Sequence, residues 1–194
     1  EALYSEKGKQ ITNAVFGEGP KDKDQLGMGV YNQYGKANEG FNISSCQFAL
    51  HYFFKDKRTL NNFIRNVSEC TKVNGYFIGG CYNGSLIFDS LKGKEVSESM
   101  SIFEDDKKIW QITKGYSINS FDNDESSLGL AIDVYQETIN KTFREYLVNF
   151  EYLTRIMENY GFTMLTRDEC NEIGIPTSVG SFQQLYGLME QEME

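Results

Sequence analysis

The side chain that most suggests a functional site in this sequence is its single histidine. His51 is the only histidine among 194 residues, and it follows an apolar stretch, Phe41–Cys46, whose pattern predicts a buried strand. The four cysteines include no Cys-x-x-Cys pair, so the pattern argues against a zinc site and favours a reduced, intracellular protein, nuclear or cytoplasmic. We therefore expect no metal at a site around His51.

The elements after His51 predict the support for such a site. Apolar residues recur every three or four positions across 57–72, which predicts a helix that stops at Asn74–Gly75. The continuous apolar run Tyr76–Cys81 then predicts a strand covered on both faces. Strand, helix and strand with short connections form a βαβ unit, so we expect an α/β fold with a parallel sheet at its core.

The other elements are predicted from periodicity and from helix stops. Helices are expected at 10–16, 23–34, 83–91 and 143–160, with a last one from about 181. Antiparallel strands are expected as an insertion around 101–137, and a short strand at 162–165.

Composition limits the class of protein. A hydrophobic fraction of 40% in 194 residues predicts one folded domain, 1–194. A net charge of −9 argues against non-specific binding to nucleic acid, which needs basic surfaces, but leaves open the recognition of one nucleotide or of a terminal structure. No run of 18 apolar residues occurs, so no membrane segment is expected.

Three short sequence motifs occur in an order that is typical of a known family. Ser45–Tyr52 reads Ser-Cys-Gln-Phe-Ala-Leu-His-Tyr, residues 74–80 read Asn-Gly-Tyr-Phe-Ile-Gly-Gly, and residues 144–150 read Arg-Glu-Tyr-Leu-Val-Asn-Phe. From about 41 to 162 the chain resembles the mRNA cap (guanine-N7) methyltransferases, most of all the methyltransferase domains of large DNA-virus capping enzymes. Gly80 stands where the family has Thr, and Arg144 where it has Pro.

The resemblance implies a function and a set of site residues. It implies a Rossmann-like, doubly wound and mostly parallel sheet that binds S-adenosylmethionine. Gln47, Phe48 and Tyr52 are then expected at the cofactor, and His51, Tyr52 and Glu145 at the cap guanine. Guanine N7 already carries a free lone pair, so methyl transfer needs positioning and no catalytic base.

Parts of the family pattern are missing from these residues, including the glycine-rich turn after the first cofactor-binding strand. We therefore expect a methyltransferase domain truncated at its N-terminus, and expect the 194 residues alone to bind S-adenosylmethionine weakly or not at all. The implied substrate is the capped 5′ end of mRNA. Fused or associated triphosphatase and guanylyltransferase domains are the implied partners.

Other interpretations remain open at this point. The alternative for His51 is a core histidine bonded to a backbone carbonyl, for Phe48 a plain core residue, and for Tyr52 part of an apolar wall. Thr142 and Glu145 also spell a capping box at a helix start. For the whole chain, the alternatives are a non-catalytic methyltransferase-like subunit and a methyltransferase with a non-RNA acceptor.

Overall fold

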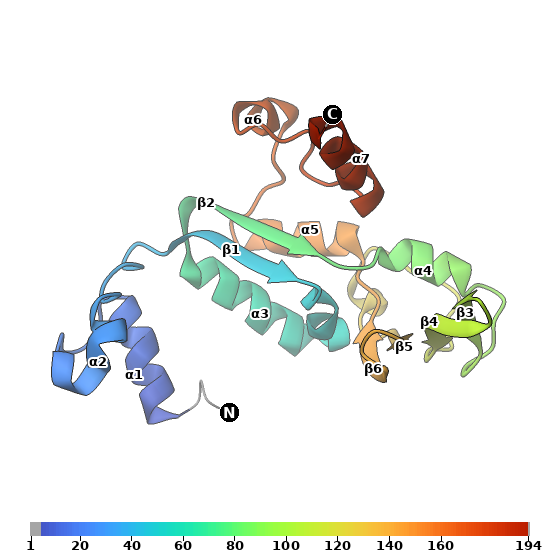
Figure 1. Ribbon diagram of the computed structural model, residues 1–194, viewed down its shortest axis with the longest axis horizontal. Helices are drawn as coiled ribbons and strands as arrows, with labels where there is room; N and C mark the ends of the chain where they lie inside the picture. Colours follow the sequence, from blue (N-terminus) through green and yellow to red (C-terminus); the bar gives the residue numbers. More distant parts are fainter. Residues whose placement is uncertain (1–4, 194) are drawn as a thin grey trace.

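The computed structural model, which describes residues 5–193, contains a two-stranded parallel sheet and a four-stranded antiparallel sheet. β1 (Phe41–Gln47) and β2 (Thr71–Gly80) pair in parallel, and α3 (Lys57–Cys70) connects them. The predicted βαβ unit is therefore confirmed. In Figure 1 this unit lies between α1 and α2 at one end of the molecule and the antiparallel sheet at the other.

Helix α3 forms where its apolar stripe predicts it, but it ends earlier. Asp56 caps its first turn by accepting a hydrogen bond from the Thr59 amide, and Leu60 and Ile64 are buried. The helix stops at Cys70, so the prediction of a stop at Asn74–Gly75 is wrong. Asn74 instead lies within β2 with φ of 62°, where the pairing with β1 shifts register, since a bulge needs a residue that tolerates the left-handed region.

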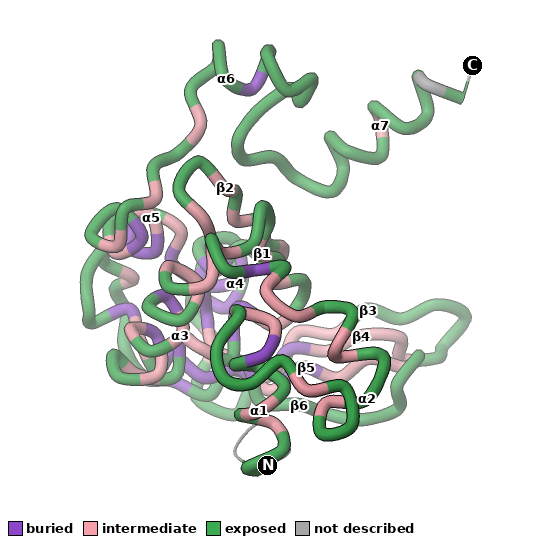
Figure 2. Tube along the Cα trace, turned by 90° about the vertical axis from the view of Figure 1, so that its left-hand side faces the viewer, coloured by how far each residue is buried: buried purple, intermediate pink, exposed green. Residues whose placement is uncertain are grey.

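The parallel strands are covered on one face only within the described residues. Phe77 points toward α3, where its ring lies edge-on to that of Phe63 with 6.2 Å between the ring centroids. On the opposite face, three side chains are largely exposed: Ile43 (56%), Tyr76 (38%) and Ile78 (48%). The prediction of a buried first strand and of a second strand covered on both faces is therefore wrong for this part of the chain. Figure 2 shows buried positions around α3 and α5, and mostly exposed ones along α6 and the start of α7.

The antiparallel strands lie where the 101–137 pattern predicts an insertion, with one strand more beyond it. Their order is β3 (Ser99–Glu104), β4 (Lys107–Lys114), β5 (Ala131–Gln136) and β6 (Lys141–Tyr146). β3 and β4 form a hairpin whose turn residues Asp105 and Asp106 both have positive φ, 46° and 63°, as a tight hairpin turn requires. Helix α4 (Gly84–Ser90) packs Ile87 and Phe88 onto this sheet.

The helix predicted from Phe143 to Tyr160 is wrong in its first half. Residues 141–146 form β6, and the helix α5 (Phe150–Asn159) starts after a short link. Asn149 fixes that start: its buried side-chain oxygen accepts the Tyr152 amide at 3.0 Å, while its nitrogen donates to the Asp122 carbonyl at 3.0 Å. The segment 162–165, predicted as a strand, has no regular structure, because no strand pairs with it.

The remaining elements are helical. They are α1 (Glu6–Val15), α2 (Lys23–Tyr31), η2 (Leu50–Lys55), η3 (Glu125–Ser127), α6 (Arg167–Glu172) and α7 (Phe182–Met193). The predicted first, second and last helices are thus confirmed with shifted ends, whereas α6 was not predicted. No helix between residues 5 and 193 combines the length and apolarity needed to cross a membrane.

Replacing Gly84 with alanine is expected to destabilise the junction between α4 and the link before α5. A Cβ at Gly84 would lie 2.3 Å from the Val148 carbonyl oxygen and 2.7 Å from the Val148 nitrogen, and backbone atoms cannot swing aside. We expect Gly84→Ala to lower the free energy of unfolding by about 1–3 kcal/mol in chemical denaturation. Gly187→Ala in α7 is the control, since nothing lies within 4 Å of its added Cβ; equal losses in both variants would contradict the packing argument.

Candidate active site

The parallel strands β1 and β2 end at the same edge of their sheet, where open α/β sheets bind ligands. Gln47 pairs with Gly80 at this edge, and the Phe48 amide donates a hydrogen bond to the Gly80 carbonyl at 2.8 Å. The chain then turns into η2, which carries His51 and Tyr52. Four of the five predicted site residues therefore lie within one turn of the carboxyl end of β1.

Phe48 has an unusual backbone and an exposed ring. Its φ of 52° lies in the left-handed region, which disfavours a bulky side chain, and strain of this kind is concentrated at functional sites. The ring is 63% exposed and stacks on Phe182 of α7, with 5.5 Å between centroids and 16° between planes. The alternative of a plain core phenylalanine is therefore wrong.

Gly80 leaves room for the side chains around it. A Cβ at this position would lie 2.9 Å from the Gln47 amide oxygen and 3.3 Å from Cζ of Phe182. The glycine that departs from the resembled pattern thus lets the Gln47 amide and the Phe182 ring approach the end of β2 closely. Any larger residue here would displace at least one of them.

His51 is buried without a partner. It is 7% exposed, and neither ring nitrogen has a hydrogen-bond partner among residues 5–193. Burial lowers the pKa of the imidazole, which favours the neutral ring. The alternative of a core histidine bonded to a backbone carbonyl is therefore wrong. Tyr52 packs edge-on against the ring at 4.2 Å and is itself 43% exposed, so it does not continue the buried wall formed by Phe54.

Glu145 comes from the distant strand β6 and meets His51. It sits opposite Ile132 of β5, on a strand and not at a helix start, so the capping-box alternative is wrong. Its Oε2 lies 3.7 Å from Nε2 of His51, too far for a hydrogen bond, and has no other partner among the described residues. Burial raises the pKa of the Glu145 carboxyl to about 7.

The contact between η2 and β6 explains why these two side chains meet. Leu50 and Phe54 of η2 are buried in one cluster with Val148 and Tyr152, which follow β6 in sequence. This packing brings residues 94 positions apart in the sequence to the same place.

The neighbouring thiol of Cys81 is unreactive near neutral pH. Burial, aided by the charges of Cys46 and Glu145, raises the pKa of the Cys81 thiol to about 12, so it stays protonated and is no nucleophile near neutral pH. The arrangement is thus suited to binding and orienting a flat ligand with adjacent N–H donors, which a buried carboxylate can accept. It is not suited to covalent catalysis.

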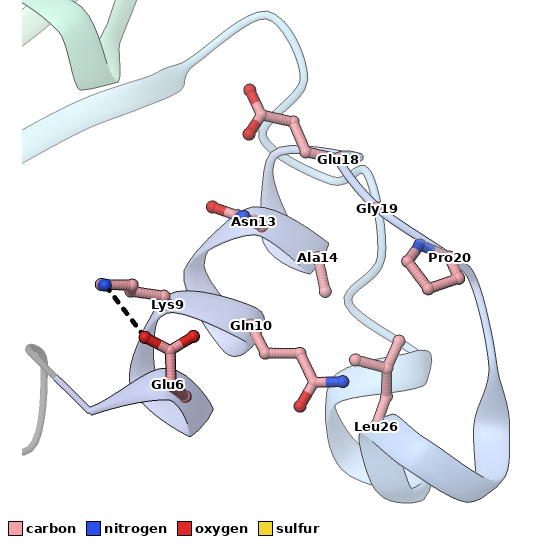
Figure 3. A pocket seen from close by; sticks show the side chains of 9 residues that line it. All are labelled: Glu6, Lys9, Gln10, Asn13, Ala14, Glu18, Gly19, Pro20 and Leu26. Atoms are coloured by element: carbon pink, nitrogen blue, oxygen red, sulfur yellow. Dashed lines mark hydrogen bonds and ion pairs between the residues drawn. The ribbon is translucent and has the colours of Figure 1, made fainter.

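A pocket lies away from this site. It is open to solvent and is formed by α1 and the segment from Glu18 to Leu26, with an ion pair between Glu6 and Lys9 at its rim (Figure 3). None of the predicted site residues lines it.

Comparison with known proteins decides the family. Residues 6–193 match the model of the mRNA (guanine-N(7))-methyltransferase domain. The chain belongs to this family. The chain is 36% identical over 145 residues to a probable mRNA-capping enzyme of Acanthamoeba polyphaga mimivirus, a match that covers 72% of this chain and 12% of that protein.

Cellular relatives also match this chain. The mRNA cap guanine-N(7) methyltransferase of Eremothecium gossypii is 28% identical over 159 residues, 79% of this chain and 34% of that protein. That of Drosophila melanogaster is 30% identical over 128 residues, 65% of this chain and 27% of that protein. The chain thus spans about a third or less of the length of these relatives.

The second departure from the resembled methyltransferase pattern also has a structural role here. Arg144, which replaces proline, lies opposite Asp133 in the β5–β6 pair and donates two hydrogen bonds to its carboxylate, at 2.9 and 2.8 Å. This pairing lowers the pKa of Asp133. The resemblance named His51, Tyr52 and Glu145, which lie together in the structure, but it did not name Tyr82, which follows the end of β2.

Proposed function

We propose that this chain forms the acceptor side of an mRNA cap guanine-N7 methyltransferase, which transfers a methyl group from S-adenosylmethionine to N7 of the cap guanine. The observation that carries the proposal is the buried pair of His51 and Glu145, whose facing polar atoms have no hydrogen-bond partner between residues 5 and 193. Buried polar groups without hydrogen bonds are costly, so such a pair calls for a ligand that satisfies them.

Guanine has the groups that this pair lacks. Its N1–H and exocyclic amine are adjacent donors, and Glu145 in its ionised form accepts both. A negative charge here also offsets the positive charge that develops on the guanine as N7 is methylated. His51 and Tyr52 then fix the orientation of the base. Because N7 has no proton to lose, none of these residues serves as a general base, and the chain's contribution is placement.

The residues at the end of β1 fit the methyl donor. S-adenosylmethionine, when bound, supplies the methyl group on a sulfonium. The exposed ring of Phe48 offers an apolar surface for adenine, and the exposed Gln47 amide offers a donor and an acceptor beside it. Tyr52 packs against His51 and follows Gln47 and Phe48 closely in sequence, so cofactor and guanine would share one edge of the sheet.

The family also suggests the wider setting. We infer that β1 and β2 belong to a Rossmann-like, doubly wound sheet, an inference supported by their parallel pairing through α3. The match to 12% of a probable mRNA-capping enzyme supports a place beside triphosphatase and guanylyltransferase activities that build the cap. We expect the protein to act inside the cell, on the capped 5′ end of mRNA.

The direct test is methyl transfer by the full-length protein from labelled S-adenosylmethionine to RNA that begins with GpppG. Nuclease digestion should release labelled 7-methylguanosine, and uncapped triphosphate RNA should remain unlabelled. Cofactor binding without transfer would favour the non-catalytic alternative. Label on a protein or a small molecule, with none on capped RNA, would favour a different acceptor.

A further inference from the structure

A tyrosine hydroxyl just beyond the end of β2 receives two hydrogen bonds. The indole nitrogen of Trp110 and the amide nitrogen of Gln136 both donate to the hydroxyl oxygen of Tyr82, each at 3.1 Å. Both groups can only donate, so they occupy the acceptor sites of this oxygen. The hydroxyl proton of Tyr82 is therefore left to donate, and no acceptor among residues 5–193 takes it.

The hydroxyl lies on the same face of the antiparallel sheet as Glu145. Trp110 pairs with Gln136 across β4 and β5, and Ile132, on the same face of β5, pairs with Glu145. Gln136 lies four residues along β5 from Ile132, which corresponds to about 13 Å along the strand. The Tyr82 hydroxyl thus lies about 13 Å along the strand direction from the place proposed for the cap guanine.

The surface around this hydroxyl is apolar, with a positive charge at its border. Phe143 lies on the same face between the two points and is 40% exposed, and Tyr82 is 36% exposed. Ile102, opposite Trp110, is 50% exposed. Lys141, opposite Gln136, is exposed at the end of β6. Aromatic faces combined with a cation are the means by which proteins hold single-stranded nucleic acid without reading its sequence.

We propose that Tyr82 and Phe143 form the subsite for the nucleoside that follows the cap guanine, the first transcribed nucleoside of the RNA. Tyr82 donates its hydroxyl proton to an oxygen of that nucleotide, and the Phe143 ring stacks on its base. The spacing from Glu145 is one that a triphosphate bridge with its two riboses can span. This inference rests on the proposed function, because it takes the guanine to lie at Glu145.

The test compares two acceptors in the full-length protein. GTP carries the guanine and three phosphates but no following nucleoside, whereas a short GpppG-capped RNA carries all of them. Tyr82→Phe removes the free donor and keeps the ring, so we expect the KM and the dissociation constant of capped RNA to rise roughly three- to tenfold, with those of GTP unchanged. Phe143→Ala should act in the same direction.

Tyr135→Phe is the matched control, because Tyr135 lies on the opposite face of β5, where its hydroxyl donates to the Asn140 side chain. Equal changes for GTP and capped RNA in Tyr82→Phe, or no change for either, would overturn the subsite. Binding is measured separately from methyl transfer: a wild-type protein that transfers to neither acceptor refutes the proposed function. The subsite would then still stand if Tyr82→Phe weakened the binding of capped RNA alone.

Discussion

Glu145→Gln is expected to lower kcat/KM for capped RNA roughly ten- to a hundredfold, the loss of a charge-assisted hydrogen bond of about 1.5–3 kcal/mol. Glutamine has no charge to offset that of the methylated guanine, and one end of its amide presents a donor to the donors of the base. Because Glu145 lies on β6, the substitution removes no helix cap, and a loss of activity would reflect the site itself.

The same variant should not lose stability. Burial disfavours the ionised carboxylate of Glu145, whose Oε2 has no hydrogen-bond partner among residues 5–193, and glutamine is neutral at every pH. At pH 8 the melting temperature of Glu145→Gln should therefore equal or exceed that of the wild type. The control is Glu104→Gln on the exposed β3–β4 hairpin, which should change neither property. Unchanged activity with unchanged melting would remove Glu145 from the site.

The raised pKa of Glu145 also gives the wild type a distinct dependence of stability on pH. The carboxyl binds its proton more tightly in the folded protein, with a pKa of about 7 against a usual value of 4.5. Its contribution to stability is therefore fully present below pH 4.5 and is lost as the pH rises through 7. The free energy of unfolding should fall more across this interval in the wild type than in Glu145→Gln.

His51→Ala is expected to reduce kcat/KM for capped RNA about tenfold or more, because the guanine loses a side chain that orients it. The dependence of kcat/KM on pH separates the two residues. Activity should rise with pH through about 7 as Glu145 ionises, and this rise should persist in His51→Ala but disappear in Glu145→Gln.

His51→Gln provides the matched control, since glutamine restores much of the side chain's size and one donor, and should recover part of the lost activity. A fall in activity with a histidine-like pKa that occurs only when His51 is present would contradict a role limited to placement. The melting temperature of His51→Ala should fall modestly, because a ring that is only 7% exposed leaves a cavity.

Local sequence pattern was sufficient to predict the βαβ unit and to name candidate site residues. The spacing of apolar residues in α3 indicates a helix with one buried face, and the apolar run Tyr76–Cys81 indicates a strand. Both elements could therefore be predicted without tertiary information. The sequence motifs around His51 and Glu145 indicated the family, and the comparison with known proteins confirms it.

The sequence pattern gave wrong predictions where the same spacing of apolar residues fits both a helix and a strand. Phe143, Tyr146 and Phe150 lie at helical spacing, yet Phe143 and Tyr146 belong to β6 because β5 offers them a hydrogen-bonding edge. Likewise, an isolated strand pattern such as 162–165 forms no strand without a partner. Pairing is a long-range property, so local spacing does not reveal it.

The sequence by itself determined which residues are site candidates and predicted the strand at whose carboxyl end four of them lie. Only the tertiary structure decided that His51 meets Glu145 across 3.7 Å without a hydrogen bond, and that Tyr82 receives donors from both Trp110 and Gln136. Periodicity tells which side of an element is buried, but not which distant element lies against it. The raised pKa of Glu145 and the free proton of Tyr82 both depend on those distant neighbours.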